Sequence, residues 1–225
     1  MFKSFAIAAL TLAFADARSE RELKNKDKVR ACEDACTAVT EDVTRYAVCN
    51  VTDPTTSFGT TGTVEFTQTR TTTRWVKKND PSEDCQLWAC TPDNEDGLIN
   101  VDADVSSLSP GKHGFHVHKW GTLDTGCGGA SGHYNPTGVD HNAYNEVPRH
   151  DGDLQMLTAD ANGDALLNYN DAQATLFGDR SIQGRAIVIH AGVDDLGDGG
   201  DAGSLANGNA GPRVGCCVIV ASDVL

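Results

Sequence analysis

The run His113-Gly114-Phe115-His116-Val117-His118 is the stretch on which the interpretation of this chain depends. The chain has seven histidines, and none of them precedes this run. Val117 and its flanks are typical of a β-strand, in which side chains two positions apart point to the same face. His116 and His118 are therefore predicted to lie on one side of the strand, close enough to share a metal ion. Neutral imidazole suits zinc and copper, although a single His-x-His pair is a weak signal.

The segments around this run predict an all-β fold. Short strands are expected at 46–51, 63–68, 98–105, 165–169, 174–177, 184–190 and 213–221. Turn signals separate them and no long helical periodicity is present, which is typical of a β-sandwich or β-barrel. Residues 121–153 and 191–211 are predicted to be long loops, and loops of that length in a compact domain are usually functional.

The N-terminal region predicts export. Lys3, the apolar run 5–14 and Ala15-Asp16-Ala17 match a secretory signal peptide over residues 1–17. The apolar run is too short to span a bilayer. Residues 18–45 are interpreted as an N-terminal extension, in which 32–45 is expected to form a short helix because Cys32 and Cys36 are one turn apart. The chain is therefore predicted to be secreted, with its β-domain over residues 46–225.

Charge and cysteine usage narrow the classes of partner. The 225 residues carry a formal net charge of −14, which disfavours nucleic acid and anionic membrane surfaces as partners. The eight cysteines are an even number, and export would permit disulfides. Their spacing does not follow a zinc-ribbon pattern. Asn50-Val51-Thr52 is a glycosylation sequon, so Asn50 is a candidate glycosylation site.

Further potential ligands follow the histidine strand. His133, His141, His150 and Asp153 offer three imidazoles and a carboxylate, which can close a tetrahedral zinc site of structural type. His116, His118 and His190 could form a second, nitrogen-rich site. If His133 served both sites, the second would have four nitrogens and suit copper(II). The spacing alone leaves open the alternative of scattered structural histidines.

Four segments together resemble the copper/zinc superoxide dismutase family. They are Gly114-Phe115-His116-Val117-His118, Gly132-His133-Tyr134-Asn135-Pro136, Gly152-Asp153-Leu154 and Gly208-Asn209-Ala210-Gly211-Pro212-Arg213. The match is continuous from 113 to 220. From 46 to 112 it is looser and is interrupted by an insertion at 70–97, interpreted as a long surface excursion. Residues 1–45 lie outside it.

The resemblance implies an eight-stranded Greek-key β-barrel, an immunoglobulin-like sandwich with long metal-binding loops. It implies copper on His116, His118, His133 and His190, and zinc on His133, His141, His150 and Asp153, with His133 bridging the two ions. The implied reaction converts superoxide to dioxygen and hydrogen peroxide. The alternative is a secreted barrel that binds or carries copper without turnover.

The resemblance also implies roles around the two metals. Asp194 matches the carboxylate that links His116 with His141, and His113 matches a structural position. Arg213 matches the arginine that receives superoxide, and His133 is the residue expected to take a proton. Cys127 and Cys216 match the disulfide of the family.

The chain departs from the family pattern in three respects. Residues 192–206 hold four aspartates and no lysine, so weaker electrostatic steering of the anion is expected. Asn50 lies on the first strand, which many family members use to dimerise, so a homodimer is left open. Cys49 and Cys217 are predicted to face the barrel interior, either paired or as free thiols. Cys32 and Cys36 are expected to pair with Cys85 and Cys90.

Overall fold

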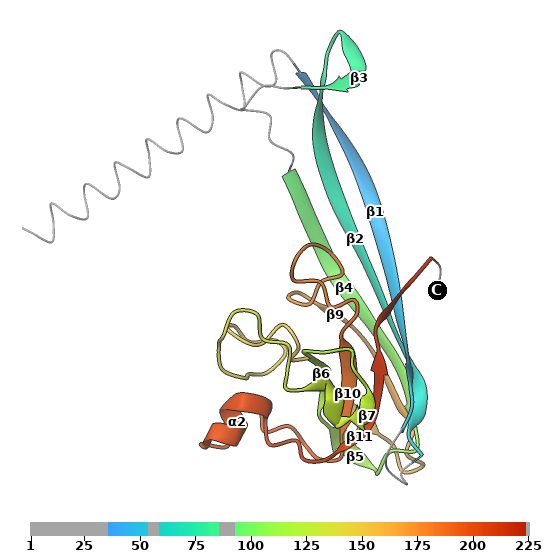
Figure 1. Cartoon of the computed structure of the whole chain (residues 1–225), viewed down its shortest axis with the longest axis vertical. Helices are drawn as coiled ribbons and strands as arrows, with labels where there is room; N and C mark the ends of the chain where they lie inside the picture. Colours follow the sequence, from blue (N-terminus) through green and yellow to red (C-terminus); the bar gives the residue numbers. More distant parts are fainter. Residues whose placement is uncertain (1–35, 54–58, 86–92, 224–225) are drawn as a thin grey trace, which may run out of the picture. The chain divides into compact units, whose positions relative to one another are not determined.

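The computed structural model of the chain describes residues 36–53, 59–85 and 93–223 (Figure 1). The predictions for residues 1–17 and for Cys32 and Cys90 lie outside these ranges. Among the described residues, no helix is long and apolar enough to cross a membrane.

Antiparallel β-strands make up most of the regular structure, so the predicted all-β class is confirmed. The described strands are β1 Cys36–Val51, β2 Thr61–Lys77, β3 Asp80–Asp84, β4 Asp93–Ser106, β5 Gly111–His113, β6 Phe115–His118, β7 Asp124–Cys127, β8 Leu157–Ala159, β9 Ala165–Asp171, β10 Ala186–His190, β11 Arg213–Val218 and β12 Val220–Ser222. The described part of the chain also has a 3-10 turn, η1, at Gly128–Ala130 and one α-helix, α2, at Ala202–Asn207.

The chain divides into two compact units. The first comprises Met1–Asp42 and Thr71–Glu95, and the second comprises Val43–Arg70 and Asp96–Leu225. The unit boundaries fall within β1, β2 and β4. In the first unit, β2 pairs with β3, and a disulfide joins Cys36 to Cys85. All the predicted metal ligands belong to the second unit.

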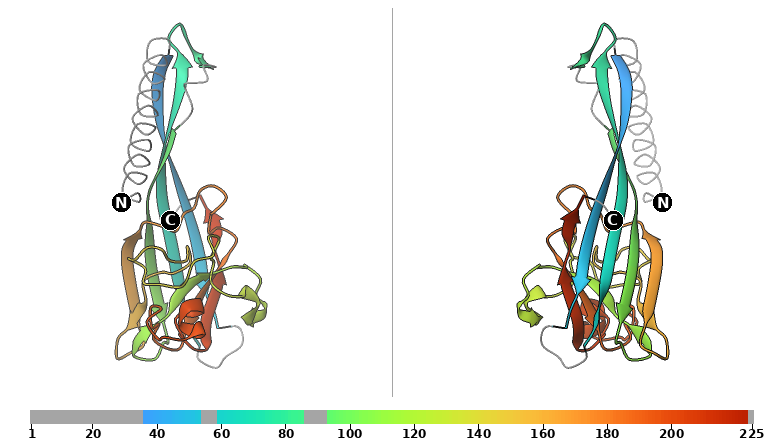
Figure 2. Two further views of the ribbon diagram at one scale, coloured as in Figure 1. Left: turned by 90° about the vertical axis from the view of Figure 1, so that its left-hand side faces the viewer. Right: turned by 90° about the vertical axis from the view of Figure 1, so that its right-hand side faces the viewer.

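The second unit packs β-sheets against one another (Figures 1 and 2). The largest sheet has the strand order β12-β1-β2-β4-β9, and the sheet that carries the histidine strand has the order β11-β10-β6. The strands β5 and β8 form a short third pair. One hydrophobic cluster draws buried side chains from both larger sheets, among them Phe66, Val101, Val117 and Ile187. This core supports the histidine strand from its apolar side.

Two local predictions were wrong. The described part of the expected helix, from residue 36 onward, is strand β1, because its β-branched threonines and valines favour extended backbone. Residues 174–177 form no strand, because the side chains of Asp171 and Gln68 accept their backbone N–H groups. The region 70–97, expected to be a long excursion, contains the end of β2, all of β3 and the start of β4.

The loop at 191–211 contains the helix that the pattern did not predict. Asp201 caps the N-terminus of α2 by accepting a hydrogen bond of 2.9 Å from the backbone N–H of Ser204. Gly208 ends the helix in the left-handed conformation, with a φ of 65°. The helix is therefore specified by its two caps rather than by hydrophobic periodicity.

Two disulfides tie β11 to other parts of the second unit. Cys216 is bonded to Cys127 at the end of β7, and its neighbour Cys217 is bonded to Cys49 on β1. Consecutive residues of a strand face opposite ways, so the two bridges lie on opposite faces of β11. The alternative of free buried thiols at Cys49 and Cys217 does not apply.

Candidate metal centre

Strand β6 places the first two predicted ligands in the interior. His116 pairs with Val188 and His118 with Ala186 of β10, and both histidines are almost fully buried. Gly114, just before β6, is closely surrounded. A Cβ there would lie 2.6 Å from the Cβ of Ala210 and 3.0 Å from the ring of His116. A glycine at this point lets the loop that precedes Arg213 approach the histidine strand.

The structure brings together four histidines at one side of this strand. His116, His118, His133 and His190 each offer a ligand atom, and these atoms lie within 4.8 Å of one another. The ring Nδ1 atoms of His118 and His190 donate to the carbonyls of Ser131 and Gly211, at 2.8 and 2.9 Å. Their Nε2 atoms are thereby left for the centre of the group, where they lie 3.4 Å apart.

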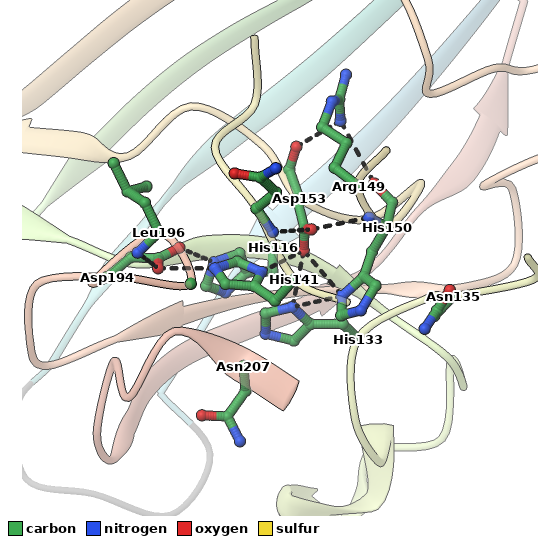
Figure 3. A network of polar contacts seen from close by, with 12 residues as sticks. His116, His133, Asn135, His141, Arg149, His150, Asp153, Asp194, Leu196 and Asn207 are labelled. Carbon is green, nitrogen blue, oxygen red and sulfur yellow. Dashed lines mark hydrogen bonds and ion pairs between the residues drawn. The ribbon is translucent and has the colours of Figure 1, made fainter. Parts of the chain in front are cut away.

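A second group surrounds Asp153. Its Oδ1 lies 2.9 Å from Nδ1 of His133, 2.8 Å from Nδ1 of His141 and 3.1 Å from Nδ1 of His150. The other ring nitrogen of His150 donates to the carbonyl of Val139 at 3.0 Å. Figure 3 shows the three rings converging on this carboxylate. Three imidazoles and one carboxylate form a tetrahedral zinc donor set.

His133 belongs to both groups. Its Nδ1 faces Asp153, which leaves Nε2 for the four-histidine group. Nε2 of His133 and Nδ1 of His116 are buried and have no hydrogen-bond partner. Buried ring nitrogens are normally hydrogen-bonded, so unpartnered ones that converge fit metal ions. The donor atoms therefore suit two neighbouring metals that share one imidazole.

Asp194 connects the two groups from outside. Its Oδ2 accepts from Nε2 of His116 at 2.7 Å, and its Oδ1 accepts from Nε2 of His141 at 2.8 Å (Figure 3). The backbone N–H of Leu196 also donates to Oδ1, at 2.8 Å. Such outer partners fix which ring nitrogen faces the metal. Gly208 lies against Asp194, since a Cβ there would come within 1.8 Å of Oδ1.

Arg213 begins β11 beside the four-histidine group. Its guanidinium donates to the carbonyl of Cys127 and to the carbonyl of Ser131. The Ser131 carbonyl also accepts from Nδ1 of His118. The Ser131 carbonyl thus links the guanidinium of Arg213 to the ring of His118. The positive charge of Arg213 is thereby fixed beside the four-histidine group, where it could bind an anion.

Comparison with known proteins identifies this arrangement. A family model for copper/zinc superoxide dismutase matches residues 89–219, more than half of the chain. The chain belongs to the copper/zinc superoxide dismutase family. A protein named superoxide dismutase [Cu-Zn], from Paramecium bursaria Chlorella virus 1, is 48% identical over 126 residues, which cover 56% of this chain and 67% of that relative. Copper and zinc are accordingly the metals of this chain, and superoxide is its substrate.

The electrostatics of the histidines suit metal binding by a superoxide dismutase. Burial lowers the pKa of His133 to about 3 and that of His190 to about 4, so both rings are neutral at pH 7. Burial also acts to lower the pKa of His141, but its hydrogen bonds with Asp153 and Asp194 dominate and raise the value to about 9. In the metal-free protein, His141 is therefore a cation between two carboxylates, and zinc must displace its proton.

Several residues near the metals were not singled out from the sequence. The carbonyl of Ser131 carries no sequence signal, because any residue has one. Arg149 forms a buried ion pair with Asp171, with 2.8 Å between Nη2 and Oδ1. Asp151 is fully buried between two zinc-type ligands. Arg149 and Asp151 could have been found from the sequence, because both are charged and directly flank the ligand His150.

Proposed function

We propose that this chain dismutates superoxide at copper held by His116, His118, His133 and His190, next to zinc held by His133, His141, His150 and Asp153. The supporting observation is that the two nitrogens of the His133 ring serve different donor groups. A ring placed in this way can bridge two ions, which scattered structural histidines would not require.

Copper, when bound, supplies the one-electron exchange that oxidises one superoxide to dioxygen and reduces another to peroxide. The residues of the chain supply position, charge and protons. Nδ1 of His133 stays against Asp153 and holds the ring in place, while Nε2 is the atom that takes up a proton and gives it back. With Nδ1 turned to Asp153, Nε2 is the ring atom on the side of the copper-type ligands, so it can pass a proton to the departing peroxide.

Arg213 receives the anion in this proposal. Its guanidinium is half-buried, so its charge is less screened than that of a surface arginine. Burial lowers its pKa, yet arginine remains charged at any physiological pH. Two carbonyls orient the guanidinium and leave the substrate a fixed partner. A copper carrier would not need such a group, which favours the enzyme over the alternative without turnover.

Reciprocal variants test the assignment of the metals. His118→Ala is expected to lose copper and retain zinc, His150→Ala is expected to lose zinc and retain copper, and each serves as the control for the other. Metal analysis should accompany an assay of superoxide consumption by the purified parent chain. One copper and one zinc per chain without superoxide consumption would instead support the copper carrier.

We also propose that residues 1–17 direct export, that 18–45 form an extension, and that 46–225 form the enzyme domain with an insertion at 70–97. The disulfides of the described residues support a secreted protein, because such bonds persist in oxidising compartments. N-terminal sequencing of protein recovered from the medium tests this proposal. Retention of the chain inside the cell with residue 1 in place would refute it.

The net charge of the chain and the sequon at Asn50 are the basis of the remaining proposals about partners. The net charge of −14 argues against nucleic acid and anionic membranes as partners. Asn50 is exposed on β1 and is proposed to be glycosylated. The glycan would block a homodimer formed through this strand, so we propose that the glycosylated chain is a monomer and that the unmodified chain can form the dimer. Light scattering before and after enzymatic removal of the glycan measures this, and a monomer in both states would exclude the dimer.

A further inference from the structure

A buried carboxylate lies between two zinc ligands without being one of them. Asp151 follows His150 and precedes Asp153 by two residues, and its side chain has no accessible surface. It is absent from the donor groups that could hold a metal among the described residues. Its oxygens instead accept from Nε and Nη2 of Arg180, the first of these at 2.6 Å. The carboxylate therefore points to a different part of the chain.

Gln173 completes this contact. Its side-chain Nε2 donates to Oδ1 of Asp151 at 2.9 Å and to the backbone carbonyl of Arg149 at 2.7 Å. One amide thus holds both a side chain and the backbone of the segment that carries His150. Gln173 and Arg180 also line a pocket of about 410 Å³.

We propose that Asp151, Arg180 and Gln173 form a clasp that positions the segment 149–153 and thereby sets the affinity of the chain for zinc. This inference rests on the proposed zinc site. A carboxylate in the interior is unfavourable unless it is paired and hydrogen-bonded. The pairing with Arg180 and Gln173 favours the one conformation of the segment in which Asp151 is satisfied. In that conformation His150 and Asp153 face His141.

The clasp acts beside a second tether. Arg149 donates to both oxygens of Asp171, at 2.8 Å each, and its Nη1 donates to the carbonyl of Asp153 at 2.6 Å. Removal of the clasp alone therefore loosens the segment without releasing it. Loss of an outer partner of a metal ligand typically weakens affinity about 10- to 100-fold, and we expect the lower end of that range for zinc.

The effect is expected to be specific to zinc. The copper-type ligands His118 and His190 lie on β6 and β10, and their rings are anchored by the carbonyls of Ser131 and Gly211. None of these contacts involves the clasp. Loss of the clasp should therefore change the copper affinity by less than about threefold, because the copper-type ligands keep their own outer partners.

The first test is Arg180→Gln in the full metal-free chain, with Arg70→Gln as the matched control. Arg70 also forms an ion pair with an aspartate, Asp96, and this pair contacts no metal ligand. Competition with a chelator measures the dissociation constants of zinc and copper. Arg180→Gln should bind zinc about tenfold more weakly, and the control should bind both metals like the parent.

A second variant separates the effect of the clasp on zinc affinity from a general loss of stability. Arg180→Gln leaves Asp151 buried and unpaired, which lowers stability whatever the clasp does. In Asp151→Asn/Arg180→Gln no charge is stranded, so thermal unfolding of the metal-free protein should return toward that of the parent. The zinc affinity should stay about tenfold low because the tether is still missing. Recovery of the zinc affinity together with stability would overturn the proposal.

Failure of the clasp and failure of the zinc site give different results. If the parent chain bound no zinc, the proposed zinc site itself would be wrong. If the parent bound zinc and Arg180→Gln bound it equally well, only the clasp would be wrong.

Discussion

Replacing Asp194 with asparagine tests the link between the two metal groups. The carboxylate is buried and accepts one hydrogen bond from His116 and one from His141. Asparagine has nearly the same shape, but it has one acceptor oxygen and an NH2 group that only donates. One of the two rings must therefore lose its acceptor. Asp195→Asn is the matched control, because Asp195 binds Ser204 and Asn209 rather than a ligand histidine.

The structure indicates which metal should lose more affinity in Asp194→Asn. His116 lies on β6, where backbone pairing with β10 holds the residue independently of Asp194. His141 lies in irregular chain, and its backbone N–H donates to the carbonyl of Leu205 in α2. His141 therefore depends on the loop of Asp194 for its position. We expect the zinc affinity to fall by about 10- to 100-fold, which is about 1.4–2.8 kcal/mol, and the copper affinity to fall less.

A change in the pKa of His141 opposes this loss of zinc affinity. Asp194 contributes to the raised pKa of His141, so its removal also reduces the competition of protons with zinc. Titration with a chelator at several pH values separates the two effects, because competition from protons fades as the pH approaches 9. A zinc affinity within threefold of the parent value, or a larger loss of copper than of zinc, would refute the reasoning.

Three further predictions concern charge. Arg213→Gln should lower superoxide consumption about tenfold to a hundredfold, because a hydrogen bond to a charged group contributes about 1.5–3 kcal/mol, with metal content unchanged by elemental analysis. Because residues 192–206 contain no lysine, turnover should depend only weakly on ionic strength; a steep fall with added salt in stopped-flow measurements would contradict this. The metal-free protein should be most stable near pH 6.5. Hydrogen bonds that outweigh burial raise the pKa of His141 to about 9, so its contribution is complete below about 6.5 and is lost as the pH rises through 9. Burial lowers the pKa of His133 to about 3, so stability falls as the pH drops below about 6.5, and a flat profile in denaturant titrations would contradict both shifts.

Local geometry explains the parts of the fold that were predictable. Alternation along a strand has a period of two, so His116 and His118 were expected on one face, and both contribute to one donor group. The same rule separates Cys216 from Cys217, which form bridges to different partners. The family match then relates distant ligands to known spacing. Each of these inferences needs only neighbours in sequence or a known motif.

Other features depend on segments that are distant in the chain. The carbonyl of Ser131 is shared by His118 and Arg213, and Asp151 contacts Arg180. Both contacts join residues that are far apart in the chain. Periodicity cannot report such contacts, because it describes one element at a time. The strand at 36–45 and the helix α2 were missed for a related reason, since tertiary pairing and caps outweighed weak local patterns. The sequence therefore identified which residues could bind metal. Packing determined which nitrogen of each histidine ring faces the metal.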